Sequence, residues 1–228
     1  MRRAALAAAA AVLLAACSRE VTPPIGRVSS RPSSPTPPAG SSPVVRPTPS
    51  PTPSPTPRVV VVRYRVEVRA RGVSGFARVV DATLRDPRGW QRAGFRLVRD
   101  DSARYLVVVA EPAETDRRCL PYDTYGKYSC QNGPVVAINA DRWRSATPEW
   151  TGDLATYRQM LVNHEVGHLL GMHHPEVQCP RRGRPAPVMA QQSTELNGCL
   201  PNPWPLPHEV RRAARHDLPL APPYSPKP

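Results

Sequence analysis

Residues 163–174 read N-H-E-V-G-H-L-L-G-M-H-H. This stretch contains four of the six histidines of the chain, together with one glutamate. It lies at the end of Leu154–Gly171, the segment that we predict as the longest helix. Such a cluster is either a metal site or a polar patch at a helix end, and the spacing of its side chains favours a metal site.

The spacing of His164 and His168 suits two ligands of one ion. Four residues apart on a helix, their side chains lie about 40° apart around the axis and about 6 Å apart along it. Two imidazoles so placed can bind one zinc ion at Zn–N distances of about 2.0–2.1 Å. Glu165 lies beside that ion, where its carboxylate can accept a proton from a zinc-bound water, whose pKa falls to about 7.

The residues after the helix supply a third ligand. Gly171 can adopt left-handed backbone angles and end the helix, and Pro175 prevents the helix from resuming. The chain can therefore turn and bring His174 to the ion; the neighbouring His173 is the alternative ligand, and the pattern selects His174. Three protein ligands and an open fourth position are typical of catalytic zinc, whereas structural zinc is closed by four.

The full pattern over residues 164–174, H-E-x-x-H-x-x-G-x-x-H, resembles that of the metzincin clan of zinc endopeptidases. Metzincins also carry a methionine in a tight turn beneath the metal, and Met189 is the candidate here. The resemblance therefore implies Zn²⁺ as cofactor, with the turn methionine at Met189 and Glu165 as the general base. It implies three zinc ligands: His164, His168 and His174.

Three further segments resemble an uncharacterised actinobacterial family of exported, metzincin-like metallopeptidases: 139–143 (N-x-x-R-W), 186–192 (A-P-V-M-x-Q-Q) and 198–205 (G-C-x-P-N-x-W-P). This resemblance covers about residues 60 to 215. It implies a sheet whose lowest strand lines the cleft antiparallel to bound peptide, and 135–139 is our candidate for that strand.

Several residues near the motif depart from the pattern or are ambiguous. Gln191 stands where some metzincin branches carry a tyrosine that binds the metal or the oxyanion, so transition-state charge would rest on zinc or on another donor. Asn163 either orients a ligand or is a solvated helix position. His208 and Glu209 begin an apparent second motif, but Arg212 replaces its second histidine, and we interpret this segment only as a helix start.

Hydrophobic patterns predict an α/β domain around the cluster. β-Branched or alternating stretches predict strands, and apolar residues at helical spacing predict a helix that Ser74 caps and Pro87 stops. The predicted strands are 59–68, 95–98, 105–110 and 135–139, and the predicted helices are 74–86, 154–171 and 207–216. This order indicates a small mixed twisted sheet backed by helices, with an active-site helix and a loop-rich C-terminal part.

The N-terminus has the composition of a lipoprotein signal. Residues 1–16 combine a basic start with an apolar run that is too short to span a bilayer. The sequence 14–17, L-A-A-C, resembles a lipobox, which makes Cys17 the predicted lipid acceptor. We expect a lipid-anchored protein of the cell membrane that faces outward; the alternative is a secreted protein cut near Ala16.

Composition divides the rest of the chain into three parts. Residues 17–57 are rich in Pro, Ser and Thr and predict an extended stalk. Residues 58–218 are long enough for one domain with a single core, which would be the metzincin-like catalytic domain. Residues 219–228 predict a proline-rich tail.

The cysteines of the predicted domain indicate disulfides. Without Cys17, four remain, an even number in an oxidising compartment. Three pairings are open, and short loops favour Cys119 with Cys130 and Cys179 with Cys199. The second bridge would enclose Met189 and pin its loop under the metal.

The charge of the chain does not point to nucleic acid. The net charge is +13, but the arginines are scattered instead of clustered with aromatic residues. We expect a monomeric zinc metallopeptidase that acts on a peptide or protein substrate. Two alternatives are a zinc-stabilised binding module of the cell envelope without catalysis and an enzyme that hydrolyses a non-peptide amide, such as one in peptidoglycan.

Overall fold

The computed structural model describes residues 59–217 and residue 220. The predicted signal peptide, the lipid acceptor Cys17, the stalk and almost all of the tail lie outside these residues. Within the described part, no helix is long and apolar enough to cross a membrane.

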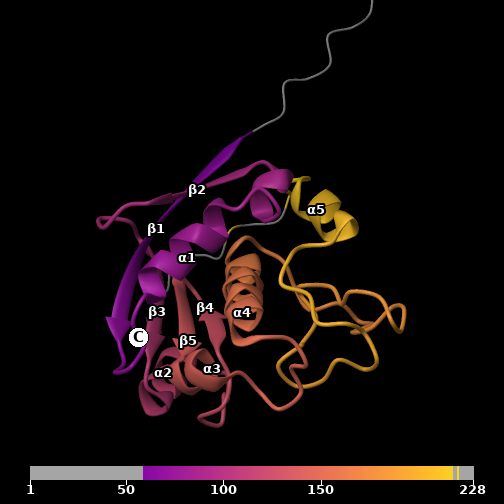
Figure 1. The fold of residues 1–228 in the computed structure, drawn as a ribbon. Helices are drawn as coiled ribbons and strands as arrows, with labels where there is room; N and C mark the ends of the chain where they lie inside the picture. The colour runs from indigo at the N-terminus through magenta and orange to yellow at the C-terminus, as the bar shows by residue number, and fades with distance from the viewer. Residues whose placement is uncertain (1–58, 218–219, 221–228) are drawn as a thin grey trace, which may run out of the picture. The chain divides into compact units, whose positions relative to one another are not determined.

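The domain is a mixed α/β fold, as predicted. Its sheet contains five strands and is flanked by helices (Figure 1). The strands are β1 (Val60–Arg69), β2 (Phe95–Arg99), β3 (Tyr105–Ala110), β4 (Cys130–Asn132) and β5 (Val135–Asn139). The helices are α1 (Phe76–Arg85), the 3₁₀ helix η1 (Trp90–Ala93), α2 (Pro112–Cys119), α3 (Ala140–Ser145), α4 (Leu154–Leu169) and α5 (Pro207–Ala213).

The strands follow the order β2-β1-β3-β5-β4. Four of them are parallel, and β4 alone runs antiparallel, beside β5. Val66 pairs with Val107 of β3, and Val108 pairs with Ala137 of β5. The apolar run of β3 is buried on both faces, which is typical of a central strand in a parallel sheet.

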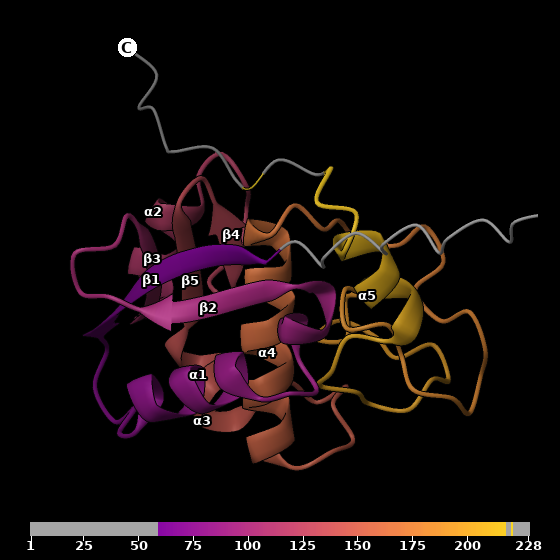
Figure 2. The same ribbon diagram turned by 90° about the horizontal axis from the view of Figure 1, so that it is seen from above.

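Alternate residues of β3 enter two different cores. Val107 and Val109 join the larger core, which also includes buried residues of α1, α3 and α4. Leu106 and Val108 join a smaller core with Cys119 of α2. Figure 2 shows α2 on the opposite side of the sheet from α1 and α3. The larger core therefore lies on the side of the sheet that carries the histidine helix.

The helix α4 ends as the sequence predicts. Gly171 has a φ of 88°, in the left-handed region. Its N–H donates to the carbonyl of His168 and the N–H of Met172 donates to the carbonyl of Gly167, each at 2.9 Å. This pair of bonds is a Schellman motif, which satisfies the last carbonyls of the helix and redirects the chain.

The start of α1 differs from the prediction. Gly75, not Ser74, occupies the N-cap position, with a φ of 76° and no side-chain cap. The end is as predicted, because α1 stops at Arg85, two residues before Pro87.

The prediction of the strand that lines the cleft is also corrected. β5, predicted to line the cleft, lies inside the sheet between β3 and β4. β4 is an edge strand, and its Cys130 and Gln131 line a pocket of about 540 Å³. β4 has only three residues, which is too short for a periodic signal in the sequence.

Both favoured disulfides are present. Cys119 at the end of α2 is bonded to Cys130 at the start of β4, and Cys179 is bonded to Cys199. The first joins the edge strand to α2. The second closes the C-terminal loops around Met189.

Candidate metal centre

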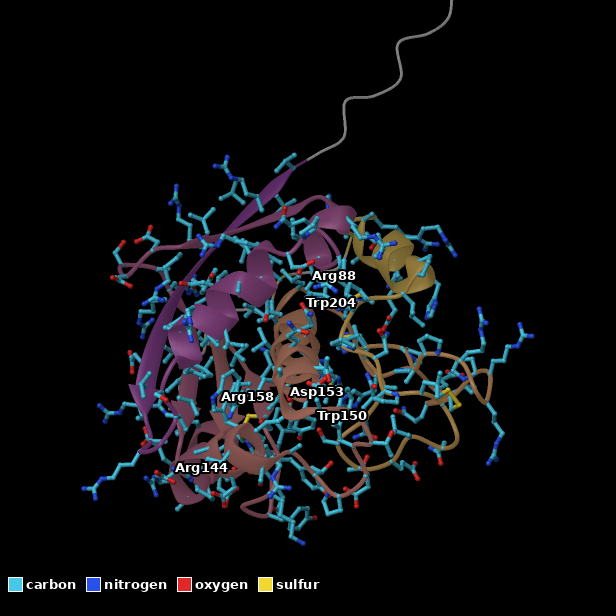
Figure 3. All side chains as sticks on the ribbon, viewed as in Figure 1. Arg88, Arg144, Trp150, Asp153, Arg158 and Trp204 are labelled. Atoms are coloured by element: carbon cyan, nitrogen blue, oxygen red, sulfur yellow. A yellow bond between two sulfur atoms is a disulfide. The ribbon has the colours of Figure 1, made fainter. Side chains whose placement is uncertain are left out.

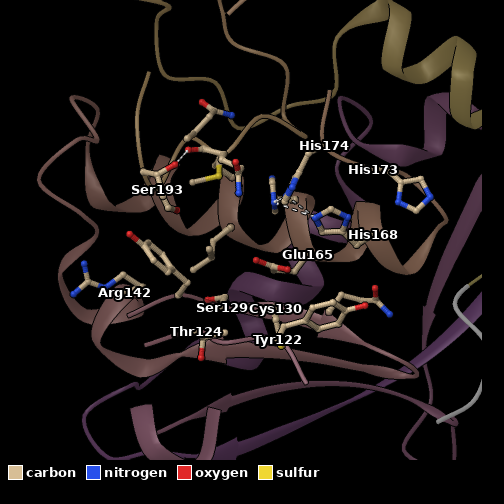
Figure 4. A pocket seen from close by; sticks show the side chains of 18 of the residues that line it. Tyr122, Thr124, Ser129, Cys130, Arg142, Glu165, His168, His173, His174 and Ser193 are labelled. Atoms are coloured by element: carbon tan, nitrogen blue, oxygen red, sulfur yellow. Dashed lines mark hydrogen bonds between the residues drawn. The ribbon is translucent and has the colours of Figure 1, made fainter. Parts of the chain in front are cut away.

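Three histidines meet beside the C-terminal half of α4. The Nε2 atom of His164 lies 3.2 Å from that of His168 and 3.2 Å from that of His174, and the latter two are 3.1 Å apart. In Figure 4 the rings of His168 and His174 lie close together, while His173 lies to one side. The structure therefore brings His174, and not His173, together with His164 and His168.

The arrangement fits a metal ion. In a tetrahedral zinc site, ligand nitrogens about 2.0–2.1 Å from the ion are separated by about 3.3 Å, close to the spacing here. The Nδ1–H of His164 donates to the carbonyl of Val188 at 2.8 Å, and the Nδ1–H of His168 donates to that of Met172 at 2.9 Å. These bonds leave the Nε2 lone pairs directed at one another, an arrangement that a shared cation stabilises. The three histidines can thus bind one metal ion.

The protonation states suit metal binding. Burial, with the neighbouring histidine charges as a second cause, lowers the pKa of His164 well below its ordinary value and that of His168 to about 4. Burial also lowers the pKa of His174. All three imidazoles are therefore neutral at pH 7, the form that binds metal.

Glu165 lies next to the cluster and lines the pocket. Its residue exposure is only 5%, and burial raises the pKa of its carboxyl to about 8. Within residues 59–217, no side chain or backbone group hydrogen-bonds to this carboxylate. It is thus free to contact a molecule in the pocket (Figure 4).

The pocket has a volume of about 540 Å³ and three walls. One is the loop from Tyr122 to Ser129, continued by β4. The second is α4 from Met160 to His168, and the third is the segment 191–194 that follows Met189. Elements from the middle and the C-terminal half of the chain therefore meet at the histidines.

Met189 lies beneath the histidine helix, at the position predicted for it. It is buried, and its side chain packs against Gly167. A Cβ at Gly167 would overlap the Met189 sulfur and lie 2.8 Å from Cζ2 of Trp90. The glycine between the two histidines is therefore required by packing.

Glu209 is a buried residue whose role the sequence interpretation missed. Its carboxylate accepts hydrogen bonds from the N–H groups of Val188 at 3.0 Å, Met189 at 2.9 Å and Leu206 at 2.7 Å. Burial raises the pKa of Glu209, and these N–H groups oppose that shift. Since Val188 also accepts from His164, Glu209 holds the turn that orients a histidine. The sequence signal for this role is a glutamate at the third position of α5, where its carboxylate can accept the N–H of the N-cap residue.

Asn163, which the sequence left ambiguous, is fully buried. Its side-chain Nδ2 donates to the backbone carbonyl of Pro203 at 2.8 Å. Its backbone carbonyl accepts from the indole N–H of Trp90 at 3.0 Å. It is therefore a packing residue that ties α4 to the C-terminal loop, and not a solvated one.

Gln191 contacts a neighbouring loop. Its backbone N–H donates to Oε1 of Gln178 at 2.7 Å, and the residue lines the pocket at the wall that follows Met189. The departure from a tyrosine at this position therefore leaves an amide side chain at the pocket wall.

Comparison with known proteins places the chain in a family. No curated protein matches the chain. The family described as "Protein of unknown function (DUF3152)" matches residues 56–201, more than half of the chain, and this range contains the three histidines, Glu165 and Met189. The chain therefore belongs to the DUF3152 family of proteins of unknown function.

Proposed function

We propose that the chain is an extracytoplasmic zinc-dependent endopeptidase of metzincin type. One observation carries this proposal: three imidazole nitrogens lie within 3.2 Å of one another, beside the carboxylate of Glu165 and at the wall of an open pocket. Structural zinc sites have four protein ligands, whereas only three candidate ligands gather here among the described residues. A carboxylate beside a three-ligand site favours catalysis.

Zinc is the metal that we propose. Mg²⁺ and Ca²⁺ prefer oxygen ligands, whereas three neutral imidazoles suit Zn²⁺. When bound, zinc would supply a Lewis acid that polarises a carbonyl and lowers the pKa of water to about 7.

Glu165 is the proposed general base. Its carboxylate lines the pocket next to His164 and makes no hydrogen bond within residues 59–217. Burial alone favours the protonated carboxyl, and a cation bound by the neighbouring histidines would favour the carboxylate form. In that form Glu165 can accept the proton that an attacking water loses and donate it to the nitrogen of the leaving amine. His164 and His168 are held in the ligating tautomer by the carbonyls of Val188 and Met172.

A peptide substrate is supported by the edge strand. β4 pairs only with β5 in the sheet, so its other edge faces the pocket region with backbone groups that an extended peptide can pair with. Cys130 and Gln131 of this strand line the pocket. The disulfide from Cys119 to Cys130 fixes the strand in place.

An extracytoplasmic location is supported by the sequence and by the cysteines. Residues 1–16 resemble a signal peptide, and two disulfides lie in the described domain, which is typical of an oxidising compartment. We further propose that Cys17 carries the lipid that anchors the domain, with secretion as the alternative.

Replacing Glu165 tests the endopeptidase. Full-length Glu165→Ala, loaded with zinc, should cleave a broad peptide library about 10²- to 10⁴-fold more slowly than the wild type, the usual contribution of a general base. Zinc content and melting temperature should change little, because Glu165 makes no hydrogen bond in the described part of the chain. Glu195→Gln, on an exposed loop, is the control and should cleave like the wild type.

The absence of peptide cleavage would contradict the proposed function. If a folded, zinc-loaded wild type cleaves no peptide, the endopeptidase proposal is wrong. A zinc-stabilised binding module of the cell envelope, or hydrolysis of a non-peptide amide, would then replace it.

A further inference from the structure

Arg142 lines the pocket of the metal centre, and among the described residues its side chain has no hydrogen-bond or ion-pair partner. It lies on α3, and its Nε is buried and makes no hydrogen bond within the described residues. No carboxylate in the described part of the chain lies within 4.0 Å of its guanidinium. A buried guanidinium donor without an acceptor is uncommon, because arginine normally binds a carboxylate or a carbonyl.

Two neighbouring arginines show the usual pattern. Arg144 is paired with Glu111 at 2.8 Å and with Asp141 at 2.9 Å. Arg158 donates its Nε–H to the carbonyl of Trp143 at 2.7 Å. Figure 3 shows both of these arginines beside α3 and α4. Arg142 thus differs from them in facing the pocket with its hydrogen-bonding capacity unused.

The pocket leads from the histidines to Arg142. Leu161 and Met160 line it three and four residues before His164, which is about 4.5–6 Å along the axis of α4. Figure 4 shows Arg142 at the end of the pocket opposite His173, with Glu165 between them. On the α4 wall, the apolar side chains of Met160 and Leu161 therefore line the pocket next to the metal centre.

The charge of Arg142 affects the ionisation of Tyr157. Burial raises the pKa of Tyr157 to about 12, and the charge of Arg142 opposes that shift. The hydroxyl of Tyr157 is hydrogen-bonded at 2.9 Å to Ser193, which lines the same pocket. Arg142 is therefore close enough to Tyr157 for its charge to act near Ser193, at this end of the pocket.

We propose that Arg142 binds a carboxylate of the peptide substrate, so that the enzyme selects peptides with a negative charge close to the cleaved bond. This inference rests on the proposed endopeptidase function. The planar guanidinium fork matches a carboxylate, and the walls formed by Met160 and Leu161 suit the methylene groups of a glutamate. An acidic side chain and the terminal carboxylate of the peptide share this chemistry.

Three sets of acetylated decapeptides separate these two sources. The first carries one Glu and an amidated C-terminus, the second carries Gln at the same position and an amide, and the third carries Gln and a free C-terminal carboxylate. Full-length, zinc-loaded enzyme should cleave one carboxylate set with a kcat/KM about 10- to 100-fold above that of the neutral set, as expected for a charge-assisted hydrogen bond. The set that is preferred identifies the source of the carboxylate.

Variants assign the preference to Arg142. Arg142→Gln should bring the ratio of acidic to neutral kcat/KM close to one, and Arg142→Glu should favour a Lys-containing set over the Gln set. Arg117→Gln removes the same charge from an exposed position on α2 and should keep the wild-type ratio. Melting temperatures of the variants show that they are folded. A wild-type ratio near one for both carboxylate sets, or a ratio that Arg142→Gln retains, would overturn the proposal.

A binding measurement separates this inference from the endopeptidase proposal. In full-length Glu165→Ala, the Kd of one of the two carboxylate sets should be about 10-fold or more below that of the neutral set, and Arg142→Gln in this background should remove the difference. If the wild type cleaves no peptide, the endopeptidase proposal fails, and this Kd ratio still decides whether Arg142 binds a carboxylate. Equal Kd values would reject that role.

Discussion

Gly167 and Glu209 show how the metal-binding residues depend on contacts that are distant in the sequence. Gly167 leaves room for Met189 and Trp90 beneath α4, and Glu209 holds the turn whose carbonyl orients His164. The spacing of the motif predicts the histidine cluster, because those residues are local in sequence. It predicts neither the role of Glu209 nor the buried Nε of Arg142, since both depend on how separate elements pack.

His173 and His174 are adjacent and provide a matched pair of substitutions. His174→Ala removes one of the three converging nitrogens and should weaken zinc binding by at least about 100-fold. His173→Ala should leave zinc affinity within a few-fold of the wild type, because its ring lies away from the other three (Figure 4). Competition against a zinc chelator measures both affinities. If His173→Ala gave the larger loss, the assigned cluster would be incorrect.

The elements that were predicted correctly are those with a strong local pattern. β1, β3 and α4 are long or continuously apolar, and their bounds differ from the predicted ones by at most about two residues. The elements that were missed are all short: η1, α2, α3 and β4 have four, eight, six and three residues. Such short segments take their conformation from tertiary contacts, here a disulfide and the edge of the sheet.

Asp153 gives α4 a pH-dependent N-cap. Its side chain accepts the N–H of Thr156 at 2.7 Å, and this bond, followed by that to the Thr156 hydroxyl, lowers the pKa of Asp153 below its ordinary value of 3.8. A carboxylate with a lowered pKa stabilises the fold above its unfolded-state pKa of about 3.9 and loses that effect as the pH falls through the folded value.

Asp153→Asn keeps an N-capping side chain, but it cannot titrate and lacks the negative charge that interacts favourably with the positive end of the helix dipole. The wild type should therefore have the higher urea midpoint at pH 6, and the difference should shrink as the pH is lowered below about 4. Urea unfolding at a series of pH values measures this. Glu195→Gln, on an exposed loop, is the control, and a difference that stays constant from pH 6 to pH 3 would contradict the role of Asp153.

Across the whole domain, regular structure is unevenly distributed. The sheet and α1 to α4 occupy residues 60–169, whereas most of 170–206 is loop (Figure 1). Buried amides replace regular structure there: Gln192 donates to the carbonyls of Pro187 and Asn202, and Asn202 donates to that of Ala186. A metal held by His174 would add a further link between this loop region and α4.

Removing zinc should therefore destabilise the loop region more than the sheet. At zinc concentrations about 100-fold above Kd, binding contributes about 2.7 kcal/mol, which corresponds to a melting temperature about 5–10 °C above that of the chelated protein for a domain of this size. Hydrogen exchange after chelation should accelerate in residues 172–205 and change little in β1 and β3, because the latter are held by the larger core. His168→Ala should remove the zinc-dependent part of both measurements. Uniform acceleration throughout the domain would instead mean that the ion supports the entire fold, and no change at all would mean that the three imidazoles hold no metal in solution.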